Sequence, residues 1–208
     1  MEKRKYLDNP TGASALSFWK TCNYKKPAHI KVVHESEFDY SLLETHIDEI
    51  YFKLVHYLED IEEQCEYDRF IFVKASTEEF VNHINSCYEE EGLTVSELES
   101  YKSKPVYDED LWICLYDKEN DAIAATGIAE FDNDVEEGYL DWIQVSEGYR
   151  GRGLGKIIVY ELLRRLKKKA GFVTVSGRAD NKTKPEKLYE SCGFGSKVLW
   201  HILIEKNQ

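Results

Sequence analysis

The chain has 208 residues, of which 42% are hydrophobic, 13% aromatic and 32% charged, a composition that argues against disorder. Its formal net charge of −12 disfavours general nucleic-acid binding. No apolar run approaches the roughly 20 residues of a membrane-spanning helix. The N-terminus leads into no apolar stretch, so no secretory signal and no membrane partner are expected. The five cysteines are scattered without a CxxC pair, which predicts reduced thiols, no metal site and a cytoplasmic protein.

Residues 1–66 are the less regular part of the chain. Asn9-Pro10-Thr11-Gly12 signals a turn. Residues 28–34 alternate between polar and apolar side chains, which predicts a short strand. Residues 42–61 place apolar side chains at helical spacing, which predicts a helix. No linker rich in Gly, Ser or Pro follows, so we expect residues 1–66 to form an extension packed on a domain of residues 67–208.

From Tyr67 onward the pattern is cleaner. Ser76 and Thr94 each precede a Glu by three residues, as in a capping box at a helix start. The expected order is a strand at 69–74, two helices from Ser76 and Thr94, and strands at 110–117, 121–131 and 138–146. A helix at 154–170, a strand at 172–176, a helix at 185–192 and a strand at 197–205 follow. This order predicts a mixed α/β (α+β) domain whose consecutive strands form antiparallel hairpins.

A glycine-rich turn joins the strand at 138–146, the fourth strand counted from residue 69, to the helix at 154–170. Its sequence is Arg150-Gly151-Arg152-Gly153-Leu154-Gly155-Lys156. Glycines let a backbone approach a ligand closely, and a helix start offers unpaired N–H groups and the positive end of its dipole. With three cations nearby, the turn predicts an anion site suited to phosphate.

Two common phosphate-binding loops do not fit this turn. A P-loop needs Gly-x-x-x-x-Gly-Lys-Ser/Thr, but Arg150 stands in place of the first Gly and Ile157 in place of the Ser or Thr. A dinucleotide fingerprint needs a third Gly where Lys156 stands. Residues 150–187 hold twelve Lys or Arg against three acids, which is typical of either a solvated helix face or a polyanion site.

Two motifs resemble the GCN5-related N-acetyltransferase (GNAT) superfamily. The family signature, Arg/Gln-x-x-Gly-x-Gly/Ala after the fourth strand, is matched by Arg150 to Gly155. A second family motif resembles Asn181 together with Leu188-Tyr189-Glu190-Ser191-Cys192-Gly193-Phe194. The resemblance covers residues 67–208. It implies the GNAT fold, a central, mostly antiparallel mixed sheet flanked by helices, with strands four and five splayed apart.

The resemblance also implies that acetyl-coenzyme A is the co-substrate. The backbone of the glycine turn would bind its pyrophosphate, and the end of the fourth strand would pair with its pantetheine arm. Asn181 matches a residue that hydrogen-bonds this arm. The implied cofactor-binding residues are Ile143, Gln144, Val145, Arg150, Gly151, Arg152, Gly153, Leu154, Gly155, Lys156 and Asn181.

Three residues are candidates for proton transfer. Tyr189 matches the tyrosine that gives a proton to the leaving thiolate in this family. Asp141, on the fourth strand, fits the place of a carboxylate base, and Glu130, on the third strand, is a further candidate. Ser176 stands where other family members carry a glutamate, a departure from that variant. Asp141 fits equally well as a residue that binds a cationic substrate or that faces solvent.

The resemblance thus implies an N-acetyltransferase that acts by direct attack of an amine on the thioester. The acceptor is an amine of a small molecule or a peptide, and the acidic remainder of the chain favours a cationic one. Two alternatives stay open: a coenzyme A-binding sensor without turnover, and transfer to a hydroxyl or of a longer acyl group. The oligomeric state also stays open, with a homodimer as one of the possibilities.

Overall fold

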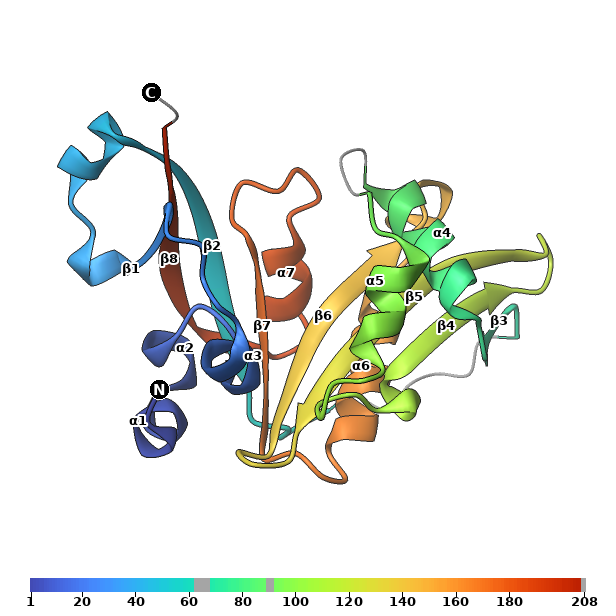
Figure 1. Ribbon diagram of the computed structural model, residues 1–208. Coiled ribbons are helices and arrows are strands. Elements are labelled where there is room, and N and C mark those ends of the chain that lie inside the picture. The colour runs from blue at the N-terminus through green and yellow to red at the C-terminus, as the bar shows by residue number, and fades with distance from the viewer. Residues whose placement is uncertain (62–67, 89–91, 207–208) are drawn as a thin grey trace. The chain divides into compact units, whose positions relative to one another are not determined.

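The computed structural model describes residues 1–61, 68–88 and 92–206 (Figure 1). Its contacts divide the chain into two compact units. One unit combines residues 1–57 with residues 174–208, and the other holds residues 58–173. The division expected from the sequence, at residue 66, stays a prediction. Among the described residues, no helix is long and apolar enough to cross a membrane.

The first unit is built on a sheet with the strand order β1-β8-β2-β7. β8 pairs antiparallel with both β1 and β2. The strands are β1 (Ile30–His34), β2 (His46–His56), β7 (Phe172–Arg178, which spans the boundary between the units) and β8 (Gly195–Glu205). The helices are α1 (Lys3–Asp8), α2 (Pro10–Ala13), α3 (Phe18–Asn23) and α7 (Pro185–Glu190), with 3-10 turns η1 (Glu35–Glu37) and η2 (Tyr40–Glu44).

Both faces of this sheet are covered, as two neighbouring residues of β2 show. The Phe52 ring lies 6.3 Å from the ring of Tyr189 on α7. Lys53 points to the opposite face, since successive side chains of a strand alternate. There its Nζ donates to Tyr6 Oη (2.9 Å), Ser14 O (3.0 Å) and Leu16 O (2.6 Å). The N-terminal helices therefore cover one face and α7 the other.

Two further bonds hold the N-terminal helices to the first unit. Ser176 Oγ on β7 donates to Ala15 O at 2.8 Å, and Trp200 Nε1 on β8 donates to Thr11 O at 2.9 Å. The turn predicted at Asn9–Gly12 is instead the start of α2, because Asn9 Oδ1 accepts the Gly12 N–H and Pro10 opens the helix. The whole N-terminal segment is thus fastened by side chains of the sheet.

The second unit contains an antiparallel sheet with the strand order β6-β5-β4-β3. The strands are β3 (Phe70–Val73), β4 (Trp112–Asp117), β5 (Ala122–Asp132) and β6 (Glu137–Val145). The helices are α4 (Thr77–Cys87), α5 (Val95–Tyr101) and α6 (Leu154–Leu166), with 3-10 turns η3 (Glu109–Leu111) and η4 (Glu147–Tyr149). Both predicted capping boxes are confirmed, Ser76 with Glu79 and Thr94 with Glu97.

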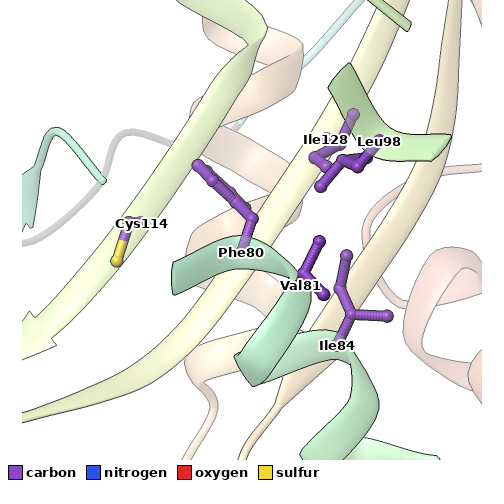
Figure 2. Packing of buried hydrophobic residues seen from close by; sticks show 6 residues of the cluster. All are labelled: Phe80, Val81, Ile84, Leu98, Cys114 and Ile128. Carbon is purple, nitrogen blue, oxygen red and sulfur yellow. The ribbon is translucent and has the colours of Figure 1, made fainter. Parts of the chain in front are cut away.

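Helices cover both faces of this sheet as well. α4 and α5 bury an apolar cluster against β4 and β5 (Figure 2), formed by Phe80, Val81, Ile84, Leu98, Cys114 and Ile128. Gly127 points the other way, and a Cβ built on it would lie 2.5 Å from Ile158 of α6. α6 therefore packs on the opposite face, where Gly127 lets the helix approach the strand closely.

The predicted mixed α/β class with a mostly antiparallel sheet is confirmed, but the helix predicted over residues 42–61 is wrong. The structure has η2 and then β2 there. The error has a physical cause, because all five residues from Phe52 to His56 are buried. A strand covered on both faces loses its polar–apolar alternation, and its apolar residues then fall at helical spacing by chance.

Candidate functional site

The glycine turn has the backbone that its sequence predicts. Gly151 and Gly153 have φ of +77° and +80°, in the left-handed region that favours glycine. Gly153 is the residue before α6, and its carbonyl accepts the N–H groups of Lys156 and Ile157. A Cβ built on either glycine would meet no atom within 4 Å. Open space therefore lies beside the turn.

The backbone N–H groups of this turn are available to a ligand. Within the described part of the chain, none of the N–H groups of residues 151–155 has a hydrogen-bond partner. They lie at the start of a helix of 13 residues, where the dipole favours negative charge. Arg150, Arg152 and Lys156 are exposed beside them. These residues fit the pyrophosphate of coenzyme A, because they combine unpaired donors, positive charge and open space.

A buried carboxylate holds the turn on one side. Tyr149 Oη donates to Asp117 Oδ2 at 2.8 Å, and Asn120 Nδ2 donates to the same oxygen at 2.8 Å. Arg69 binds both oxygens of this carboxylate, at 2.9 and 2.6 Å. The Arg69 guanidinium and these donors hold the pKa of Asp117 well below its usual range, so the group stays charged. Tyr149 is thereby anchored to the hairpin of β4 and β5.

Arg150 holds the turn on the other side. Its Nε donates to Val145 O at 3.2 Å and its Nη2 to Cys87 O at 3.4 Å. The first bond closes the turn back onto the last residue of β6, and the second joins it to the last residue of α4. The predicted cofactor-binding residues Ile143, Gln144 and Val145 pair with Gly127, Thr126 and Ala125 of β5, so β6 is held in the sheet up to its end.

The two candidate carboxylates differ in their surroundings. The register between β5 and β6 shifts between Ile128 and Ala129, which pair with Trp142 and Leu140. Asp141 is therefore the extra residue of a β-bulge, a feature that re-aims a side chain. Glu130 is buried and lies 3.7 Å from Lys104 Nζ. Its partner on β6 is Tyr139. Tyr139 precedes the last residue of β6 by six residues, which is about 20 Å along a strand. Asp141 and Glu130 both stay candidates for the base.

Tyr189 and Asn181 belong to the first unit. Tyr189 is 6% exposed, and its ring packs against Phe52 and Phe194 at centroid distances of 6.3 and 5.7 Å. Asn181 Oδ1 accepts from the Thr183 N–H at 2.9 Å and from Thr183 Oγ1 at 2.7 Å. Its Nδ2 has no partner among the described residues, so this donor is available to a ligand. The roles of both residues, and the expected splay of the fourth and fifth strands, stay predictions.

A polar network that no sequence motif predicts lies beneath α4. His83, 6% exposed, has its Nδ1 2.8 Å from Thr126 Oγ1 and its Nε2 2.8 Å from Ser146 Oγ. Thr126 Oγ1 lies 2.8 Å from Gln144 Oε1, and Ser146 Oγ donates to Ile123 O at 2.9 Å. Burial lowers the pKa of His83 to about 4, so the imidazole is neutral at pH 7. Up to 63 residues separate these groups in the chain, so no local motif could reveal them.

The second unit also has a hollow of about 490 Å³. It is bordered by β3, the start of α4 and the start of β4, with Phe72, Phe80, Trp112 and Arg165 in its wall. The glycine turn contacts the other end of α4, through Cys87. The hollow is therefore separate from the predicted pyrophosphate site.

The acetyltransferase (GNAT) family model matches residues 77–194, more than half of the chain. This span includes the glycine turn, Asn181 and Tyr189. The chain therefore belongs to the acetyltransferase (GNAT) family, and the resemblance of its two motifs is confirmed. Proteins of this family are acyltransferases that use acetyl-coenzyme A as co-substrate. A search of curated protein sequences found no match.

Several solved structures share the fold of this chain. A GCN5-related N-acetyltransferase from Sphaerobacter thermophilus has a TM-score of 0.65 at 15% identity, covering 88% of this chain and 63% of that one. A GNAT-family acetyltransferase from Colwellia psychrerythraea gives 0.57 at 14%, with 84% and 64% covered. One from Kribbella flavida gives 0.53 at 14%, with 86% and 68% covered. These identities show a shared fold, and the chain spans less than two thirds of the first two proteins.

The buried His83 should make stability depend on pH. The unfolded chain takes up a proton near pH 6.5, whereas folded His83 does so only near pH 4. The unfolded state binds more protons in this window, so the free energy of unfolding should fall as pH drops, by at most about 1.4 kcal/mol per pH unit. Urea unfolding of the wild type and of His83→Gln at pH 7, 6 and 5 measures this. Equal pH dependence in both proteins would contradict it.

Proposed function

We propose that the protein transfers an acetyl group from acetyl-coenzyme A to an amine. The observation that carries this proposal is the glycine turn, whose five consecutive N–H groups are without partners among the described residues beside two left-handed glycines. Membership of the acetyltransferase (GNAT) family supports the same ligand. The two side-chain anchors, Tyr149 and Arg150, support it as well, because they hold the turn without using its own donors.

The donor site would be built around the glycine turn and the end of β6. Residues 150–156 would bind the pyrophosphate, and the backbone of Ile143, Gln144 and Val145 would pair with the pantetheine arm. Asn181 Nδ2 would donate to the same arm. Not every cation of residues 150–187 is needed for this role. Arg164 and Arg165 pair with Glu161, and Lys169 pairs with Asp108.

Acetyl-coenzyme A supplies the activated acyl group, as a thioester that an amine can attack. The amine must be neutral to attack, although a primary amine has a pKa near 10. Asp141, re-aimed by the bulge in β6, is the proposed acceptor of the amine proton, directly or through water. Tyr189 is the proposed donor of a proton to the leaving sulfur. The proton taken from the amine and the proton given to the thiolate balance over the reaction.

The proposed acceptor is an amine of a small molecule or a peptide. The chain outside residues 150–187 is strongly acidic, because that segment carries +9 in a protein of net charge −12. An acidic surface attracts cations over distances near the Debye length. This charge distribution supports a cationic acceptor, such as a polyamine or a basic peptide.

The function is tested by measuring release of free thiol from acetyl-coenzyme A in the presence of a panel of amines. We expect release that depends on the amine, and faster with polyamines and basic peptides than with neutral or acidic amines. Binding of the coenzyme with no release for any amine would instead indicate a sensor without turnover. Release with hydroxyl acceptors, or only with longer acyl thioesters, would indicate another acyl transfer.

Gly153→Val should abolish binding of coenzyme A. A β-branched residue at φ of +80° is strained, and its side chain would enter the space assigned to phosphate. Calorimetric titration with coenzyme A measures the loss, which we expect to exceed about a hundredfold, or roughly 2.7 kcal/mol. Gly148→Val is the matched control, because Gly148 also faces open space but has no left-handed φ. Retained affinity in Gly153→Val would refute this placement of the site.

Tyr189→Phe should lower turnover at least about tenfold with little change in coenzyme affinity, because it removes only the phenolic proton donor. The ring is retained, so its packing on Phe52 and Phe194 should survive. Thiol release and calorimetry together separate the two effects. Tyr139→Phe is the control, a similarly buried tyrosine on β6. Unaltered turnover would remove Tyr189 from the acid role.

A further inference from the structure

The buried network around His83 joins α4 to the end of β6. Ser146 directly follows β6, and Thr126 and Gln144 are partners on β5 and β6. All four side chains come from the second unit. Thr126 is fully buried and Gln144 is 3% exposed. Each hydroxyl carries one hydrogen, so the distances restrict where every hydrogen of the network can lie.

The hydrogens can be assigned from the Ser146 end. If Ser146 donates to Ile123 O, then Ser146 Oγ must accept from His83 Nε2–H. A neutral imidazole then has a lone pair on Nδ1, which accepts the Thr126 hydroxyl hydrogen. Thr126 has no second hydrogen for Gln144, so Gln144 must donate its amide N–H₂ to Thr126 Oγ1. A half-turn of this amide, which exchanges its oxygen and nitrogen, makes the donation possible.

This assignment also removes a buried donor that has no partner. Gln144 Nε2 is buried without one in the orientation that points Oε1 at Thr126. After the half-turn, Gln144 Nε2 donates to Thr126, and only Gln144 Oε1 is left without a partner. Proteins tolerate a buried carbonyl oxygen without a partner better than a buried N–H without one. The Cys87 thiol, 3.9 Å from Nε2, is a weak donor and does not replace the Ser146 hydroxyl there. The opposite tautomer, with hydrogen on Nδ1, therefore makes three bonds in place of four. It also leaves Ile123 O without its hydroxyl donor. The hydrogen therefore lies on Nε2.

The bond from His83 Nε2 reaches the segment that should bind the coenzyme. Ser146 lies between Val145, the last proposed pantetheine partner, and the glycine turn. A second link joins α4 to this segment, because Arg150 Nη2 donates to Cys87 O. α4 thus restrains the end of β6 and the start of the turn at two points four residues apart.

We propose that His83 is a positioning residue for the coenzyme: through its Nε2–H bond to Ser146 it holds the end of β6 in the conformation that binds the pantetheine arm. The inference rests on the proposed function, since it assumes that this segment binds coenzyme A. His83 does not touch the reacting atoms in this role. Both of its ring nitrogens are taken up by Thr126 and Ser146, so in this role it is a fixed hydrogen-bond donor.

Two substitutions separate the two sides of the imidazole. In His83→Gln the side-chain amide nitrogen can take the place of Nε2 and still donate to Ser146. In His83→Asn the shorter side chain places its polar atoms near Nδ1 and loses the bond to Ser146. We expect the dissociation constant of coenzyme A, measured by calorimetry, to rise about tenfold in His83→Asn, the effect of one lost hydrogen bond. It should stay within about threefold of the wild type in His83→Gln.

Further variants distinguish a positioning role from a general loss of structure, and NMR tests the tautomer. Ser146→Ala should reproduce the effect of His83→Asn, and the double variant should bind no worse than either single one. His46→Asn is the control, because His46 is a similarly buried histidine in the first unit, and we expect wild-type affinity. Nitrogen-15 NMR of the free protein at pH 7 should show His83 with hydrogen on Nε2 and a bare Nδ1.

The outcomes distinguish this inference from the function on which it rests. Equal affinities in His83→Asn and His83→Gln, or a hydrogen on Nδ1, would overturn the positioning role while leaving the acetyltransferase intact. A wild-type protein that binds no coenzyme A would overturn both. Rescue by glutamine together with the Nε2–H tautomer would support the inference.

Discussion

In the glycine turn, side chains hold the shape of the loop and the backbone N–H groups are kept for a ligand. A loop that must offer its N–H groups to a ligand cannot use them to hold its own shape. Here the restraint comes from side chains at the entrance of the turn. Tyr149 is bound to the buried carboxylate of Asp117, and Arg150 is bound to the carbonyls of Val145 and Cys87. The glycines that follow are thus held in position, and their N–H groups have no partner among the described residues.

The need to hold the segment beside the glycine turn in position also explains why polar groups are buried beneath α4. A helix that packed on β5 and β6 through apolar contacts alone would tolerate small shifts along the sheet. His83, Thr126 and Ser146 replace part of that contact with hydrogen bonds of defined direction, 2.8 Å long on each side of the imidazole. The apolar cluster of Phe80, Ile84 and Ile128 supplies the burial that strengthens these bonds. Apolar packing stabilises the contact between α4 and the sheet, and the polar network fixes the position of α4 along β5 and β6.

The features that the sequence revealed are local ones. The capping boxes at Ser76 and Thr94, the hairpins from β4 to β6 and the glycine turn are each encoded within a few neighbouring residues, and the structure has all of them. β2 was misread because its burial depends on helices that pack on both of its faces. The anchors of the turn and the His83 network were missed for the same reason, since Asp117 and Tyr149, or His83 and Ser146, meet only in the folded chain.

The N-terminal segment of the first unit has a further consequence for how this protein responds to substitution. Lys53, Ser176 and Trp200 hold that segment mainly by donating to main-chain carbonyls, those of Ser14, Leu16, Ala15 and Thr11. Every residue type presents such a carbonyl, so these bonds place no demand on the identity of the residues that accept them. A substitution at Ser14, Leu16, Ala15 or Thr11 that leaves the backbone in place should therefore keep these bonds, whereas a substitution of one of the three donors would remove the bonds of that donor.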